Sequence, residues 1–87
     1  MSDTLKNLLQ TGVKFHQLGK LELASQIYTT ILRVQPENSD ANYNLGLLAV
    51  RANKLEKALP FLETALENNA DNVFHWISYI DALLETG

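Results

Sequence analysis

A period of 34 residues runs through the chain and constrains its fold more than any other feature. Glycine or apolar residues recur at this step in the pairs Gly12–Gly46, Phe15–Ala49, Leu21–Leu55, Ala24–Ala58, Tyr28–Leu62, Ile31–Ala65 and Leu32–Leu66. A residue suited to a turn recurs as well, at Gly19, Asn53 and Gly87. Each unit of such a period is one supersecondary element that stacks on its neighbours, so the chain is predicted to be a repeat protein.

The elements within each period are predicted to be helices. Between Ala41 and Asn69, apolar residues recur three and four positions apart on either side of a polar break at 51–54, which is typical of helices with one buried face. We expect helices near residues 4–18, 20–35, 39–52, 54–68 and 72–86, and no strand. Pro60 falls in the second turn of the fourth helix and is expected to distort it locally without breaking it. Asp71 or Asn72 is expected to cap the fifth helix.

The positions that recur carry a recognisable pattern. Residues 8–36 read Leu8-x2-Thr11-Gly12-x2-Phe15, then Ala24-x3-Tyr28, then Pro36, and residues 42–70 read Asn42-x2-Leu45-Gly46-x2-Ala49, then Ala58-x3-Leu62, then Ala70. A third unit starts as Trp76-x2-Tyr79-Ile80-x2-Leu83. This resembles the tetratricopeptide repeat, whose pattern is W-x2-L-G-x2-Y, A-x3-F and P.

The resemblance implies a fold and a domain organisation. It implies an all-α, right-handed superhelix of helical hairpins, with five helices in a single domain over residues 1–87. The first repeat would span about 5–38, the second about 39–72, and a half repeat 73–87. Small residues at Gly12, Gly46, Ala24 and Ala58 are expected where the two helices of a repeat cross closely. The resemblance also suggests the N-terminal part of a larger bacterial protein of this family.

Composition argues against several classes of function. The net charge is −3, and the seven Lys and Arg residues do not cluster, which argues against a nucleic-acid partner. The chain has no cysteine, and its histidines, His16 and His75, have no metal-ligand spacing. No serine lies in a nucleophile motif and no glycine-rich phosphate loop exists. We therefore expect no catalytic residue, no cofactor and no metal, and no enzyme activity within these residues.

The ends and the hydropathy of the chain suggest a location. The N-terminus lacks the basic and apolar regions of a signal peptide, and no apolar stretch approaches the ~18 residues of a membrane span. We expect no membrane span and a cytoplasmic protein.

The family resemblance implies a binding surface, because first helices of successive repeats line a concave groove in such proteins. Stepping by 34 residues gives the ladders Lys6–Asp40–Phe74, Leu9–Tyr43–Ile77, Val13–Leu47–Asp81, His16–Val50–Leu84 and Gln17–Arg51–Glu85. The candidate partner-binding residues are Leu9, Val13, Tyr43, Leu47, Val50, Arg51, Phe74, Ile77 and Asp81. Since the middle ladders are largely apolar, the expected partner is a protein or peptide that offers an amphipathic helix or an extended apolar segment.

One known partner class of the family is not expected. Family members that bind chaperone C-terminal carboxylates use a clamp of Lys, Asn and Arg. The matching positions here are Leu9, Val13, Asn44, Phe74 and Ser78, of which Asn44 alone agrees. Without cationic side chains, nothing offsets the desolvation of a carboxylate.

Three alternatives to an interaction groove stay open. The apolar groove positions could be covered by more of the same polypeptide. The fifth helix, apolar on almost every side, is expected to pack on Phe61, Ala65 and Leu66 and to leave a surface for a homodimer, with candidate self-association residues Trp76, Tyr79, Ile80, Leu83 and Leu84. Residues 72–87 also resemble segments of bacterial proteins in which such repeats precede a transferase domain, so an accessory role to a larger enzyme is a third alternative.

Overall fold

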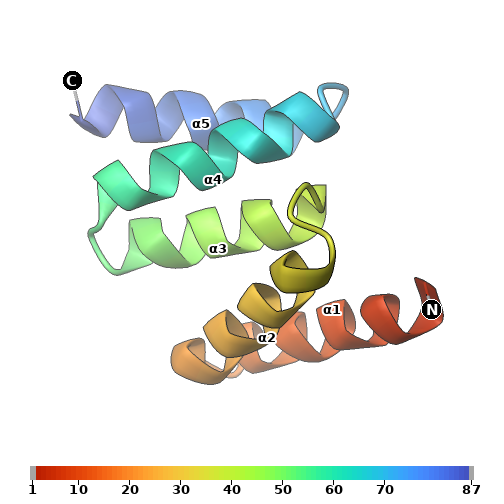
Figure 1. Ribbon diagram of the computed structural model, residues 1–87. Coiled ribbons are helices and arrows are strands. Elements are labelled where there is room, and N and C mark those ends of the chain that lie inside the picture. Colours follow the sequence, from red (N-terminus) through yellow and green to blue (C-terminus); the bar gives the residue numbers. More distant parts are fainter. Residues whose placement is uncertain (1, 87) are drawn as a thin grey trace.

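Five helices make up the fold of this chain. The computed structural model describes residues 2–86, in which α1 spans Ser2–Gln17, α2 Leu21–Val34, α3 Ser39–Arg51, α4 Leu55–Asn68 and α5 Val73–Thr86. No strand occurs within residues 2–86. The helices stack in chain order, from α1 and α2 at one end to α5 at the other (Figure 1). The predicted all-α fold of sequential hairpins is confirmed, with boundaries within two residues of expectation.

The same turn closes each helical hairpin. Gly19 and Asn53 both have positive φ, at 78° and 60°. The amide of Gly19 donates to the carbonyl of His16 and the next amide donates to Phe15, and the corresponding bonds run from Asn53 to Val50 and from Lys54 to Ala49. This pair of bonds is the Schellman motif, which needs a left-handed residue. The recurring turn residue is therefore explained at two of its three positions, and Gly87 lies outside the described residues.

Asparagine side chains begin α3 and α5. The Oδ1 atom of Asn38 accepts a hydrogen bond from the amide of Ala41 at 2.9 Å. The Oδ1 atom of Asn72 accepts from the amides of Phe74 and His75 at 2.9 and 3.3 Å. These bonds satisfy amides that have no partner within their own helix. Of the two predicted caps of α5, Asn72 is thus the one used.

A proline inside α4 does not interrupt that helix. Pro60 lies in the second turn of α4, which runs unbroken from Leu55 to Asn68. The carbonyl of Pro60 accepts a hydrogen bond from Oγ1 of Thr64 at 2.9 Å. The absence of a break agrees with the prediction.

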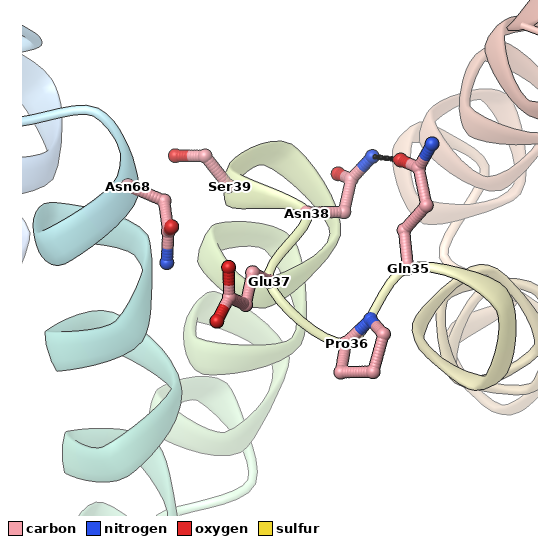
Figure 2. Close-up of a pocket in the computed structure, with 6 residues that line it drawn as sticks. All are labelled: Gln35, Pro36, Glu37, Asn38, Ser39 and Asn68. Atoms are coloured by element: carbon pink, nitrogen blue, oxygen red, sulfur yellow. Dashed lines mark hydrogen bonds between the residues drawn. The ribbon is translucent and has the colours of Figure 1, made fainter.

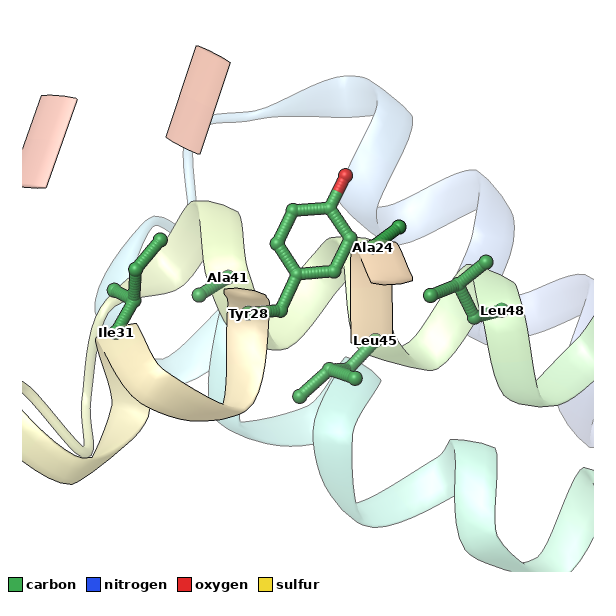
Figure 3. Packing of buried hydrophobic residues seen from close by; sticks show 6 residues of the cluster. All are labelled: Ala24, Tyr28, Ile31, Ala41, Leu45 and Leu48. Atoms are coloured by element: carbon green, nitrogen blue, oxygen red, sulfur yellow. The ribbon is translucent and has the colours of Figure 1, made fainter. Parts of the chain in front are cut away.

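The buried side chains form two clusters along the stack. The first joins α2 to α3 and holds Ala24, Tyr28, Ile31, Ala41, Leu45 and Leu48 (Figure 3). The second joins α4 to α5 and holds Ala58, Leu62 and Ala82. Phe61, expected to contact the fifth helix, is half-buried against the first cluster, which belongs to α2 and α3.

Glycine allows the two helices of each hairpin to cross closely. A β-carbon placed on Gly12 would lie 2.7 Å from Cε1 of Tyr28, and one on Gly46 would lie 2.5 Å from Cδ2 of Leu62. Both distances are shorter than non-bonded carbon atoms tolerate. The α2 and α4 helices therefore sit directly on these glycines, while Ala24 and Ala58 are fully buried nearby.

Candidate protein-interaction surfaces

The first candidate surface lies on the three odd-numbered helices. We use the name odd-helix surface for the nine predicted positions Leu9, Val13, Tyr43, Leu47, Val50, Arg51, Phe74, Ile77 and Asp81. The α1 helix contacts α3, and α3 contacts α5, so the ladders derived from the period lie on neighbouring helices. Leu9, Val13, Leu47 and Val50 are half-buried, whereas Phe74 and Ile77 are 70% and 50% exposed.

Polar and aromatic contacts fix the α3 side of this surface against α5. The ring of Tyr43 stacks on the ring of His75, with centroids 4.2 Å apart and an interplanar angle of 26°. The hydroxyl of Tyr43 lies 3.2 Å from Oγ of Ser78. Because both partners of Tyr43 belong to α5, the Tyr43 side chain is held in place and is less available to a ligand than Leu47 or Ile77.

Arg51, a member of the odd-helix surface, lies close enough to His16 on α1 to affect its protonation. Burial, and the positive charge of Arg51 in addition, lower the pKa of His16. Asn44, the one position that matched the carboxylate clamp, donates its Nδ2 hydrogen to the carbonyl of Asp40 at 2.9 Å. This bond uses one of the two amide hydrogens of Asn44 within its own helix.

His75 has a structural role that the sequence reasoning missed. It is 2% exposed, and its Nδ1 atom lies 3.4 Å from Oγ of Ser39, which donates to the carbonyl of Ala65 at 2.9 Å. Burial lowers the pKa of His75, against the opposing effects of the Asp40 carboxylate and the Ala65 carbonyl. The period contained the signal, because His75 stands 34 residues after Ala41, which is fully buried.

The buried imidazole predicts a loss of stability in acid. Since the pKa of His75 is lower in the folded state than the ordinary value of 6.5, the folded protein favours the neutral ring. Its contribution is present above pH 6.5 and is lost as the pH falls through the folded-state pKa. We expect the urea midpoint of the wild type to fall as the pH is lowered from 7 to 5. The urea midpoint of His75→Phe, which keeps an aromatic ring, should fall less steeply. Since the pKa of His16 is lowered too, His16→Gln should also reduce the slope, and the double variant should reduce it more than either single change. An unchanged slope in His75→Phe would contradict the assignment.

The second candidate surface is the outer face of α5. We define the α5 outer face as Trp76, Ile80, Leu83 and Leu84, which are 45%, 48%, 42% and 74% exposed. The fifth predicted self-association residue, Tyr79, lies elsewhere. It is half-buried against the second cluster, and its hydroxyl donates to Oε2 of Glu63 at 3.3 Å.

A shallow pocket beside the turn between α2 and α3 belongs to a helix cap. Its lining residues are Gln35, Pro36, Glu37, Asn38, Ser39 and Asn68 (Figure 2). Nδ2 of Asn38 donates to Oε1 of Gln35 at 2.9 Å, and the hydroxyl of Ser39 is bound to Ala65. These polar groups hold the start of α3 rather than a ligand.

Residues 2–86 contain neither a cluster of metal ligands nor a helix able to cross a membrane. Within residues 2–86, no group of three or more His, Cys, Asp and Glu side chains is placed to hold a metal ion. Among the described helices, none combines the length and hydropathy needed to cross a bilayer.

The chain is similar in sequence to a known protein family and to parts of two much longer proteins. The sequence profile of the family described as tetratricopeptide repeat matches residues 15–73. Cellulose synthase operon protein C of Komagataeibacter xylinus is 34% identical over 67 residues, which are 77% of this chain and 5% of that protein. Aspartyl/asparaginyl beta-hydroxylase of Mus musculus is 32% identical over 65 residues, 75% of this chain and 8% of that protein. The chain thus spans less than a tenth of either relative.

Proposed function

Because the chain belongs to the tetratricopeptide repeat family, we propose that it is a non-enzymatic module that binds a protein segment along the odd-helix surface. The single observation that carries the proposal is the row of apolar side chains left accessible there. Leu47 and Val50 on α3 are half-buried, and Ile77 on the neighbouring α5 is 50% exposed. Accessible apolar groups grouped on adjacent helices are typical of interaction sites rather than of ordinary surface.

The chemistry of the surface defines the kind of segment that it would bind. Its centre is aliphatic, and its charged members, Arg51 and Asp81, are exposed. An amphipathic helix or an extended apolar segment fits this arrangement, since its apolar side would cover Leu47 and Val50 and its polar side would remain in water. A purely acidic or basic ligand would find little to pair with.

Replacing Leu47 by aspartate tests this proposal. Peptides selected from a library of amphipathic helices and extended apolar segments would be titrated against the protein by fluorescence polarisation. Since Leu47→Asp places a charge in the apolar centre, we expect affinity to fall at least about tenfold, or about 1.4 kcal/mol. Far-UV circular dichroism should stay helical.

Leu23 provides the matched control. It is 44% exposed on α2, outside the odd-helix surface, so Leu23→Asp makes the same chemical change at an exposed position. Wild-type affinity is expected in Leu23→Asp. Binding that survives Leu47→Asp, or that is lost equally in both variants, would show that the odd-helix surface is not the site.

A further inference from the structure

Charge changes sign across the odd-helix surface. The α1, α3 and α5 helices all run from right to left in Figure 1, so their C-terminal ends lie at one edge. The last turn of α1 contains His16 and that of α3 contains Arg51, whereas α5 has no basic residue in its last turn and carries Asp81 and Glu85 in its C-terminal half. The surface is therefore basic beside α1 and α3 and acidic on α5.

Helix stability accounts for the basic side but not for the acidic side. Burial, and then the positive charge of Arg51, lower the pKa of His16, so these two groups lie near each other on neighbouring helices. Cationic side chains at a helix C-terminus are stabilised by the helix dipole. The same rule disfavours Glu85 at the end of α5, so the carboxylates there need another explanation.

The acidic side stays open in a complete hairpin. Leu47 and Val13 stand one and two periods before Asp81, and both are only half-buried although α4 and α2 follow them. Arg51, the equivalent of Glu85, is exposed. A helix packed on α5 as α4 packs on α3 would leave these positions accessible, so the acidic side does not depend on what covers the α5 outer face.

We propose that the partner on the odd-helix surface is an amphipathic helix with an acidic side chain over Arg51 and a basic side chain over Asp81. This inference rests on the proposed function and adds the charge pattern and the conformation of the partner. The two charges lie on adjacent helices, whose axes are typically about 8–10 Å apart. Residues seven positions apart in an α-helix are separated by about 10.5 Å along its axis, so they match this spacing.

The spacing favours a helix over an extended segment. In an extended segment, residues three apart span about 10 Å but point to opposite sides. In a helix, positions i, i+3, i+4 and i+7 share one side. An acidic residue at i and a basic residue at i+7 would reach the two charged sides, and apolar residues at i+3 and i+4 would cover Leu47, Val50 and Ile77.

Four helical peptides test the charge pattern by fluorescence polarisation. They share the apolar residues and carry glutamate or glutamine at i and lysine or glutamine at i+7. The glutamate–lysine peptide should bind the wild type about threefold more tightly than either peptide with one glutamine, and about tenfold more tightly than the peptide with two. At about 0.5 M salt these differences should largely disappear, because exposed charge pairs are screened.

Substitutions in the protein show which charges meet. In Arg51→Gln the peptide glutamate should lose its advantage over glutamine while the lysine keeps its own. The double variant Asp81→Asn/Glu85→Gln should show the reverse. Arg33→Gln is the matched control, since Arg33 also lies in the last turn of a helix but on α2, outside the odd-helix surface. It should bind all four peptides like the wild type.

His16 gives a second signal for the position of the acidic end. A carboxylate placed over Arg51 would oppose the effect of its charge on His16. The pKa of His16, followed by NMR at equal saturation, should therefore be higher with the glutamate–lysine peptide than with the glutamine–lysine peptide. An identical pKa with both peptides would place the glutamate elsewhere and overturn the proposed orientation.

The binding results separate this inference from the proposed function. Equal binding of all four peptides, equal effects of Arg51→Gln and Arg33→Gln, or undiminished binding of a glutamate–lysine peptide broken by a central proline would overturn the helical charge pattern. If the peptides bind equally but lose affinity in Leu47→Asp, the proposed function stands without that pattern. Failure of every peptide to bind would overturn both.

Discussion

Replacing Gly46 by isoleucine, the residue found 34 positions later, should lower the free energy of unfolding by about 3 kcal/mol or more. The β-carbon alone would lie 2.5 Å from Cδ2 and 2.7 Å from Cγ of Leu62, which is fully buried between α3 and α4. Neither side chain has room to turn away, so the two helices must separate. For a domain of this size, with about 5–10 kcal/mol in total, that loss is a large fraction of the stability.

Urea unfolding followed by circular dichroism measures the effect. The control Gln10→Ile adds the same side chain at an exposed position of α1 and should stay within about 0.5 kcal/mol of the wild type. A Gly46→Ile variant as stable as the control would mean that α3 and α4 do not cross at Gly46.

The turns and crossings of this fold were predictable from the sequence because they depend on local chemistry. Gly19 and Asn53 are residue types that tolerate a left-handed backbone, and the structure finds both with positive φ. Gly12 and Gly46 recur with the period because a larger side chain would clash at each crossing. In both cases one residue type meets one geometric requirement, so its position in the sequence determines its place in the fold.

The contacts between repeats were harder to predict, because they depend on the angle at which one hairpin leans on the next. Phe61 lies on the side of α4 that faces the first cluster, a difference of a fraction of a helical turn from the predicted contact with α5. Tyr79 points toward Glu63 instead of joining the α5 outer face. In the sequence His75 could be assessed only as a possible metal ligand, whereas in the structure its ring stacks on Tyr43 between α3 and α5. A 34-residue step specifies which positions correspond but leaves open what each one touches.

For the candidate surfaces, too, the period indicates which positions correspond but not which side chains stay accessible. The period correctly grouped the odd-helix positions on neighbouring helices, and composition identified their centre as apolar. Which of those side chains remain accessible depends on neighbours from another helix. Tyr43 is engaged by His75 and Ser78, while Ile77 on the same ladder is half exposed. The accessible residues Leu47 and Ile77 are therefore better targets for mutation than Tyr43.

Two substitutions at Tyr28 separate the contribution of its ring to stability from that of its hydroxyl. The side chain is 0% exposed, its ring packs over Gly12, and within residues 2–86 its hydroxyl has no hydrogen-bond partner (Figure 3). Removing the ring in Tyr28→Ala leaves a cavity in the first cluster and should cost about 3–5 kcal/mol. Tyr28→Phe keeps the ring and removes a desolvated hydroxyl, so it should be neutral or stabilising by up to about 1 kcal/mol.

The pH dependence gives a second measurement on the same residue. Burial raises the pKa of Tyr28 to about 12, above its ordinary value of 10.0, so the folded state favours the neutral phenol. The stability from this group is fully present below pH 10 and is lost as the pH rises toward 12. Tyr28→Phe should therefore lose less stability than the wild type between pH 9 and pH 11. If Tyr28→Phe destabilises the protein by more than about 1 kcal/mol at pH 7, the hydroxyl has a bonding partner and the assignment is wrong.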